Sequence, residues 1–214
     1  MIHLFALLSL LLCGVCYTGF QNSSHFHNTG NRRSLLFLVF GGALLLRLLL
    51  AYTTHGFSND IACFAAWADR IFTLGPGQFY SAEMFTDYPP GFMYVLYLIG
   101  ALRSLLQIPY YSDLHILLLK LPAILCDIAC GFLLHREAVK RLHFSDLQGI
   151  FAASAYLFQP AVILNSSCWG QVDSVYTLMI ILMCLFLMKG NLLPAYAVYG
   201  LGVLLKPQML IFTP

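Results

Sequence analysis

Long apolar segments dominate this chain and limit what it can fold into. A helix that crosses a bilayer needs roughly 20 predominantly apolar residues. The segments that approach this length are Ser34–Ala51, Leu114–Leu134, Leu147–Leu164, Val172–Met188 and Leu192–Leu205. Only 9% of the residues are charged, whereas a soluble domain carries about 25%. The sequence therefore predicts an all-α, polytopic transmembrane protein that lies in a lipid bilayer.

The two ends of the chain set the expected boundaries. Met1–Phe20 is apolar but lacks the positive n-region of a signal peptide, so it is either an extra uncleaved span or a mis-assigned start, which gives about five to six spans in total. Residues 1–33 then form an apolar segment and a cytoplasmic loop, and residues 34–214 form the membrane domain. The apolar run Met209–Pro214 is too short for a span. We therefore expect the N-terminal part of a longer membrane protein, truncated at its C-terminus.

Composition argues against several kinds of partner. The formal net charge is only +2 and no basic stripe is present, which disfavours a nucleic-acid partner. The seven cysteines lie mainly in apolar runs, and Cys126 and Cys130, four residues apart, have no histidine at ligand spacing. We interpret these two as small core residues, and expect neither a disulfide framework nor a cysteine metal site.

One long loop, from about Tyr52 to Gly91, gathers acidic residues between apolar segments. They are Asp60, Asp69, Glu83 and Asp87. The segment that follows, Phe92–Leu106, has 15 residues and includes Arg103. That length suits a re-entrant or interfacial helix better than a span.

Basic residues give the orientation of the predicted spans. Arg32 and Arg33 precede the first span, so the positive-inside rule places its start in the cytoplasm and the long loop outside. If Phe92–Leu106 does not cross, the cluster Arg136–Arg141 is also cytoplasmic, and the Trp169–Ser174 connection is outside. We therefore expect an outer catalytic loop over about residues 52–113 and an extracytoplasmic site.

The outer loop contains two features with predictable shape. Apolar residues recur at helical spacing between Ile61 and Leu74, which predicts an amphipathic helix on the membrane surface. The double proline of Asp87-Tyr88-Pro89-Pro90-Gly91 fixes an extended backbone and so holds Asp87 and Tyr88 in one orientation. Asp60 either caps the surface helix or acts as a general base at the membrane boundary.

Charged residues inside predicted spans are costly, and are therefore candidates for function. Arg47 either snorkels to the interface or binds an anion in the site. Lys120 and Asp127 are seven residues apart on one helix face. Lys120 lies nearer the outer end, where it can meet a lipid phosphate, and Asp127 is expected to pair with a neighbouring helix.

The short connection Trp169–Ser174 brings further polar groups to the outer face. Gln171 and Asp173 supply hydrogen-bonding groups, and Trp169 either stacks on a sugar or anchors at the interface. The segment Lys206-Pro207-Gln208 adds a cation at the same level. So many polar elements on one face exceed what simple loop connections need.

In this order, the elements resemble the GT-C superfamily of membrane glycosyltransferases. The matching residues are the acid Asp60 after the first span, Asp87-Tyr88-Pro89-Pro90-Gly91, Lys120–Asp127, Trp169–Ser174 and Lys206-Pro207-Gln208. The chain looks most like bacterial proteins related to the GPI mannosyltransferase of the PIG-V type, from about Leu44 onward.

The resemblance implies an enzyme that transfers a hexose, expected to be mannose, from a polyprenyl-phosphate donor with inversion. The acceptor is a hydroxyl of a glycan, a lipid or a protein. Carried over by position, Asp60 is the base and Asp87 positions the substrate. The substrate-binding residues are expected to be Arg47, Tyr88, Lys120, Trp169, Gln171, Asp173, Lys206 and Gln208. No cofactor is expected, and the alternative is a divalent metal held by Asp60 and Asp87.

Two other functions remain open. A transporter or lipid-linked sugar flippase would be built from inverted repeats or broken spans with charges at mid-membrane, and the sequence shows no internal repeat. An inactive fragment is the other alternative, because the chain ends within an apolar run.

Overall fold

The computed structural model describes residues 9–12, 14, 15, 17–19, 21, 32–82 and 84–213. Within these residues the chain is helical and has no strand, so the all-α prediction is confirmed. Much of the apolar segment Met1–Phe20, considered as an extra span, lies outside the described residues, as does Glu83 of the outer loop.

Eight α-helices follow one another from residue 32 onward in the described part of the chain. They are α2 (Arg32–Thr53), α3 (Ser58–Leu74), α4 (Pro90–Leu105), α5 (Asp113–Lys140), α6 (Asp146–Leu157), α7 (Pro160–Ile163), α8 (Asp173–Met188) and α9 (Leu192–Leu205). Shorter turns complete the order: η2 (Pro76–Gln78), η3 (Leu164–Trp169), which is π-helical, and η4 (Pro207–Phe212).

Two described helices are long and apolar enough to cross a membrane, namely α2 with 22 residues and α5 with 28. A third candidate consists of α6 with the α7–η3 segment, which meet at 51°. The helices α8 and α9 have 16 and 14 residues, fewer than the roughly 20 that a crossing needs. The structure thus supports two or three candidate spans, and the larger predicted total stays a prediction.

The span predicted over Leu147–Leu164 is not one continuous helix but a bent pair of helices, which is still a candidate for a broken span. The helix α6 ends at Leu157, and α7 begins at Pro160. Proline has no N–H to continue the hydrogen-bond ladder and pushes the preceding residue out of the helical region. Gln159 accordingly adopts an extended backbone, with φ −62° and ψ 119°.

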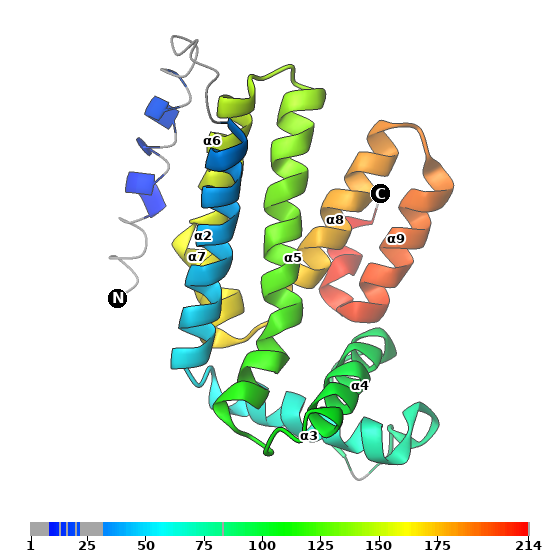
Figure 1. Cartoon of the computed structure of the whole chain (residues 1–214). Coiled ribbons are helices and arrows are strands. Elements are labelled where there is room, and N and C mark those ends of the chain that lie inside the picture. Colours follow the sequence, from blue (N-terminus) through cyan, green and yellow to red (C-terminus); the bar gives the residue numbers. More distant parts are fainter. Residues whose placement is uncertain are drawn as a thin grey trace.

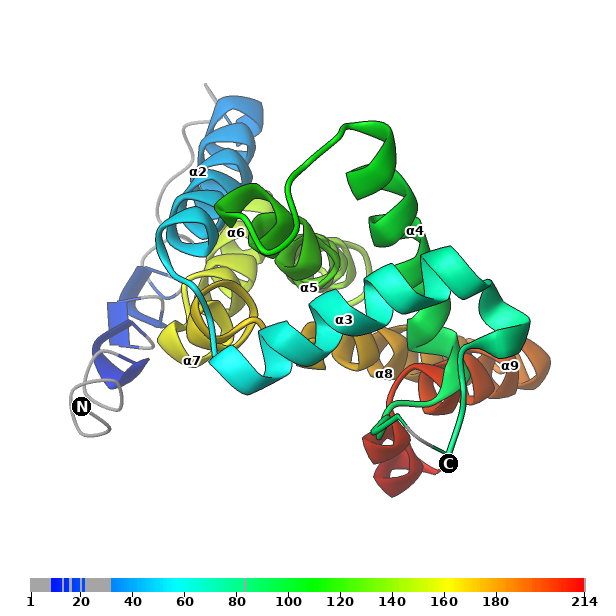
Figure 2. The same ribbon diagram turned by 90° about the horizontal axis from the view of Figure 1, so that it is seen from below.

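The helices form an upright bundle with two helices across one end. In Figure 1, α2 runs downward and α5 returns upward beside it, while α3 and α4 stay at the lower end. Figure 2, seen from below, shows α3 crossing this end and α4 lying against it. The chain therefore enters and leaves the α3–α4 region at the same end of the bundle, as the non-crossing interpretation of Phe92–Leu106 requires.

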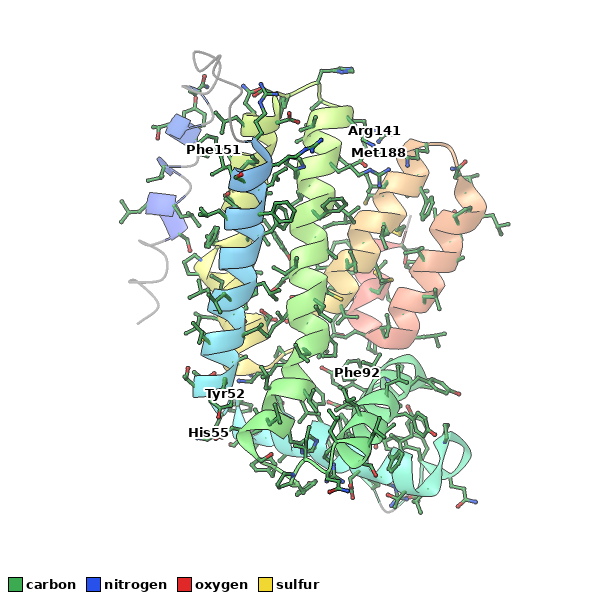
Figure 3. The ribbon with its side chains drawn as sticks, viewed as in Figure 1. Tyr52, His55, Phe92, Arg141, Phe151 and Met188 are labelled. Atoms are coloured by element: carbon green, nitrogen blue, oxygen red, sulfur yellow. The ribbon has the colours of Figure 1, made fainter. Side chains whose placement is uncertain are left out.

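Basic residues lie at the opposite, upper end. Figure 3 labels Arg141 and Met188 there, where Arg141 Nη2 donates to the Met188 carbonyl at 3.0 Å. Arg32 pairs with Asp146 at 2.9 Å, both side chains being exposed. The same figure labels Tyr52 and His55 at the lower end of α2. The orientation of these two ends across a membrane stays a prediction.

The amphipathic helix expected on the membrane surface is confirmed as a helix, but its apolar face packs against protein. Phe64, Trp67 and Ile71 of α3 are at most 3% exposed. The helix α4 crosses them closely, because a Cβ at Gly100 would lie 2.5 Å from the Ala68 carbonyl oxygen. Trp67 is therefore a core residue whose Nε1 donates to the Phe85 carbonyl at 3.1 Å, and not an interfacial anchor.

Asp127, halfway along α5, joins several helices in the bundle core. Its buried carboxylate accepts hydrogen bonds from Arg47 Nε at 3.2 Å, Ser166 Oγ at 2.6 Å, Ser174 Oγ at 2.6 Å and the Tyr156 hydroxyl at 3.2 Å. These donors come from α2, η3, α8 and α6. The prediction that Asp127 pairs with a neighbouring helix is confirmed.

Both interpretations of Arg47 are wrong. Its side chain is fully buried, with Nε on Asp127 and Nη1 donating to the Ala43 carbonyl at 3.3 Å. The guanidinium therefore neither reaches the interface nor faces a site for substrate. Its partner is instead the buried carboxylate of Asp127 on α5.

Candidate functional site

A cavity of about 250 Å³ opens where α3, the segment before α4, the η3–α8 connection and η4 meet. Its lining residues are Asp60, Cys63, Phe64, Trp67, Phe85, Asp87, Tyr88, Gln171, Lys206, Pro207 and Gln208. The sequence analysis named six of these as site residues, and the fold brings them together from four separate stretches of chain. We call this space the main cavity.

Asp60 contributes its carboxylate to the main cavity from the first turn of α3. The N-cap of α3 is Phe57, and no side chain caps the helix, so the capping interpretation of Asp60 is wrong. Its Oδ2 accepts hydrogen bonds from Trp169 Nε1 at 3.1 Å and from Gln171 Nε2 at 2.5 Å. Within the described part of the chain, Oδ1 accepts none.

The connection that carries Trp169 and Gln171 is held tightly against the start of α3. The π-helical turn η3 ends at Gly170, whose φ of +89° favours glycine. A Cβ at this position would also lie 2.6 Å from Ile61 Cδ1. Phe57 N donates to the Trp169 carbonyl at 2.8 Å, and their rings lie 5.3 Å apart. Such π-helical turns occur frequently at functional sites.

Lys206 lies at the wall of the main cavity and is only 7% exposed. Its Nζ forms an ion pair with Asp173 and lies 3.4 Å from Gln171 Oε1. It also lies 5.7 Å from the centres of the Tyr88 and Tyr176 rings, within the range of a cation–π interaction. The predicted placement of Lys206 beside Gln171 and Asp173 therefore occurs in the structure.

Asn165 is a further member of this group that sequence reasoning missed. Its Nδ2 donates to Asp173 Oδ2 at 2.8 Å, so Asp173 bridges Asn165 and Lys206. An asparagine inside an apolar run carries no distinctive signal. Its proximity to Asp173 depends on the π-helical turn, which sequence periodicity does not reveal.

The Asp87-Tyr88 pair sits at the rim of the main cavity. Asp87 is exposed, and the Tyr88 hydroxyl donates to Gln171 Oε1 at 3.4 Å. Burial, together with the nearby carboxylates of Asp173, Asp87 and Asp60, raises the pKa of Tyr88. Its phenol is therefore neutral at ordinary pH and serves as a hydrogen-bond donor.

Gly91 explains how the double-proline segment reaches the cavity. A Cβ there would lie 2.5 Å from the Leu204 carbonyl oxygen, so only glycine lets the start of α4 approach the end of α9 this closely. Leu204 is two residues before Lys206. The contact therefore sets Tyr88 beside Lys206.

Cys63, one turn after Asp60, is a lining residue that the sequence analysis did not select. Burial, followed by Asp87 and Asp60, raises the pKa of its thiol. The carboxylates of Asp87 and Asp60 both lie near enough to the Cys63 thiol, inside the main cavity, to disfavour its ionised form. A lone cysteine on an amphipathic helix gives no signal that would have identified it in advance.

A second cavity, of about 400 Å³, lies on the other side of Lys206. It is lined by Asn165, Trp169, Gln171, Asp173, Tyr176, Lys206 and Gln208. Gln171, Lys206 and Gln208 belong to both cavities. The two spaces therefore share one wall, and a ligand bound in either would contact the same three side chains.

Lys120 does not line either of these cavities. Its side chain is fully buried, and its ammonium donates only to backbone and hydroxyl oxygens. The expectation that it faces a donor phosphate is therefore wrong for this structure. The described residues also contain no group of three or more His, Cys, Asp or Glu side chains placed to hold a metal. The divalent-metal alternative would have only Asp60 and Asp87 as ligands.

Comparison with protein-family models, with curated proteins and with solved structures found no match to this chain. The likeness to GT-C glycosyltransferases therefore depends on the motifs named above. Any function has to be argued from the chemistry of the two cavities.

Proposed function

We propose that this protein is a membrane glycosyltransferase of the GT-C type, which transfers a hexose from a polyprenyl-phosphate donor to an acceptor hydroxyl. The Asp60 carboxylate takes the proton of that hydroxyl as its oxygen bonds to the anomeric carbon. The bond from this carbon to the phosphate oxygen breaks, and the lipid phosphate leaves as an anion. Attack opposite to the departing group inverts the anomeric centre, and no general acid is needed.

The geometry of Asp60 carries this proposal. Trp169 and Gln171 both donate to Oδ2, which fixes the orientation of the carboxylate. Oδ1 has no hydrogen-bond partner in the described part of the chain, so it is available to a hydroxyl in the main cavity. A general base must lie within hydrogen-bond reach of the proton that it removes, and a fixed carboxylate with one free oxygen meets that need.

The walls of the two cavities suit a sugar. Trp169 is 50% exposed and lines the second cavity, so part of its indole is accessible to a sugar. Gln171 and Gln208 offer amide groups to hydroxyls from the shared wall. Such a combination of one aromatic face and a few placed polar groups is typical of small-ligand sites.

Lys206 is the residue that we assign to the leaving phosphate. A cation beside the departing group stabilises the charge that develops there. In this structure Lys206 is paired with Asp173, so a phosphate would compete with that carboxylate for the ammonium. Asp173 would keep its hydrogen bond from Asn165 during such an exchange.

The proposal places both cavities at the extracytoplasmic surface of a multi-pass membrane protein. Arg32 begins α2, and Arg141 and Lys189 follow the ends of α5 and α8. These helix ends lie opposite the α3–α4 region, which favours a cytoplasmic location for the upper end. A donor that arrives through the lipid also accounts for the site being beside apolar helices. The choice of mannose and of a polyprenyl donor comes from the resemblance to GT-C glycosyltransferases, and so does the expectation of a GT-C-like arrangement of further helices.

The transporter alternative is less well supported. It would have charged residues line a path through the membrane. Three charged residues within α2 and α5, Arg47, Asp127 and Lys120, are instead fully buried and bonded to neighbouring groups.

Transfer of radiolabelled mannose from polyprenyl-phosphate mannose, catalysed by membranes that contain the full chain, tests the proposal. Wild type should form labelled product, and Asp60→Asn should lower the rate by about 100-fold or more, the usual contribution of general base catalysis. Asp113→Asn is the matched control, because Asp113 lies at the same end of the bundle but lines neither cavity. Equal activity of Asp60→Asn and wild type would refute the base assignment, and absence of transfer by wild type would refute the proposed reaction.

A further inference from the structure

Lys120 is a fully buried cation without a carboxylate partner in the described part of the chain. Its Nζ donates to the Ala51 carbonyl at 3.2 Å, the Thr54 carbonyl at 2.7 Å, Thr54 Oγ1 at 3.1 Å and the Ser167 carbonyl at 2.9 Å. A buried charge is unfavourable unless it is well compensated. Here neutral oxygens provide all of the compensation.

The position of these oxygens explains how they hold a cation. Ala51 and Thr54 lie at the C-terminal end of α2, and Ser167 lies in the last turn of η3. Carbonyl groups at the end of a helix lack intrahelical partners and carry the negative end of the helix dipole. One ammonium therefore satisfies orphan carbonyls from two helix ends at once.

The two helix ends lead directly into two of the four stretches that line the main cavity, those of Asp60 and Gln171. Thr54 is six residues before Asp60, and Ser167 is two residues before Trp169 and four before Gln171. Gly56 and Gly170 pack closely where the ends of α2 and η3 meet. A Cβ at Gly56 would lie 2.7 Å from the Trp169 carbonyl oxygen, and one at Gly170 would lie 3.4 Å from Lys120 Cε.

We propose that Lys120 is a positioning residue that fixes Trp169 and Gln171 against the Asp60 carboxylate by joining the ends of α2 and η3. Its importance for catalysis rests on the proposed function, but its effect on the contact between Trp169 and Asp60 does not. Lys120 itself touches no substrate in this account. Without the ammonium, the Ala51 and Thr54 carbonyls lose this donor, and the Ser167 carbonyl keeps only the longer bond from Thr54 Oγ1 at 3.3 Å. The two helix ends then separate, and Trp169 moves away from Asp60.

The fluorescence of Trp169 measures this contact without any enzymatic activity. The chain has two tryptophans, and replacing the buried Trp67 with phenylalanine leaves Trp169 as the only indole. In this Trp67→Phe protein we expect Lys120→Met to shift Trp169 emission to longer wavelength. Acrylamide quenching should rise about twofold, because the indole would go from 50% exposed to nearly fully exposed when the junction opens. Lys140→Met, an exposed lysine at the other end of the bundle, is the matched control and should change neither value.

A milder variant keeps the test decisive if Lys120→Met does not fold. Thr54→Val preserves shape but removes Oγ1, which accepts from Lys120 and donates to the Leu50, Ser167 and Cys168 carbonyls. It weakens the same junction but keeps the ammonium, so it should raise quenching by a smaller amount in the same direction. Unchanged emission and quenching in folded Lys120→Met would overturn the proposal, and so would an unchanged Thr54→Val if Lys120→Met is unfolded. If transfer activity proves absent in wild type while Lys120→Met shifts the fluorescence, the positioning role stands and the proposed reaction falls.

Discussion

The buried pair of Arg47 and Asp127 allows a quantitative prediction about stability. We consider Asp127→Asn, Arg47→Met and the double variant. Asp127→Asn leaves the guanidinium inside the bundle without a counter-charge, with the Ala43 carbonyl and the new amide oxygen as neutral acceptors. Arg47→Met leaves the carboxylate with hydroxyl donors from three other residues. The two single variants are therefore not equivalent, although they break the same ion pair.

The expected free energies follow from what each variant leaves unpaired. Removing one partner of a buried pair typically costs about 3–5 kcal/mol. We assign about 5 kcal/mol to Asp127→Asn, since an uncompensated cation remains, and about 3 kcal/mol to Arg47→Met. The latter also removes Nη2 of Arg47, which is buried and has no hydrogen-bond partner in the described structure. The double variant should lose about 2 kcal/mol less unfolding free energy than the sum of the losses in the two single variants, because no unpaired charge then remains buried.

Thermal unfolding of the purified protein in detergent micelles, followed by circular dichroism of the helices, measures these differences. Asp146→Asn is the control, because it breaks the ion pair with Arg32 at the surface. The side chains of Arg32 and Asp146 are 44% and 39% exposed. It should change the free energy of unfolding by about 0.5 kcal/mol or less. A larger loss of unfolding free energy in Arg47→Met than in Asp127→Asn would contradict this prediction. So would a loss in the double variant equal to the sum of the losses in the two single variants.

Two further predictions concern the rim of the main cavity. Gly91→Ala should lower the free energy of unfolding by about 1–3 kcal/mol, since its Cβ would lie 2.5 Å from the Leu204 carbonyl oxygen. Gly41→Ala, in a helix with open space around it, should instead be neutral or stabilising in the same thermal assay. Because burial raises the pKa of Tyr88 above its ordinary value of 10.0, its stabilising effect is full below pH 10.0 and is lost as pH rises beyond it. Tyr88→Phe should therefore flatten the loss of stability at alkaline pH, and an unchanged pH profile would contradict this.

The helices were largely predictable because each depends on its own sequence. The expected segment Leu192–Leu205 coincides with α9, and Val172–Met188 differs from α8 by one residue. Apolar content and length decide such segments locally. The break before Pro160 was also visible in the sequence, since proline and the residue before it resist helix, but the apolar run outweighed that signal in the interpretation.

The partners of buried charges were not predictable in the same way. Arg47 and Asp127 are 80 residues apart, and nothing in either helix indicates which faces meet. Charged residues are rare in apolar segments, which indicated a role for Arg47 and Lys120. The same rarity is expected whether a charged residue binds substrate or holds helices together. The expectation that Asp60 and Gln171 lie on the same side of the bundle was correct, and they are hydrogen-bonded. The expected topology places every outer connection at one end of the helices, and this alone brings the motif residues together.

The loss of Arg47 and Lys120 as candidate phosphate contacts changes the charge of the proposed site. Among the described residues that line the main cavity, Asp60 and Asp87 are acidic and Lys206 is the cation, and Lys206 is already paired with Asp173. Under the proposed function, Lys206 would turn from Asp173 toward the phosphate of the donor. Asn165 makes that exchange feasible, because its hydrogen bond at 2.8 Å leaves Asp173 partnered when the ammonium departs. Under the proposed function, Asn165, which the sequence did not single out, would let the site accept a phosphate.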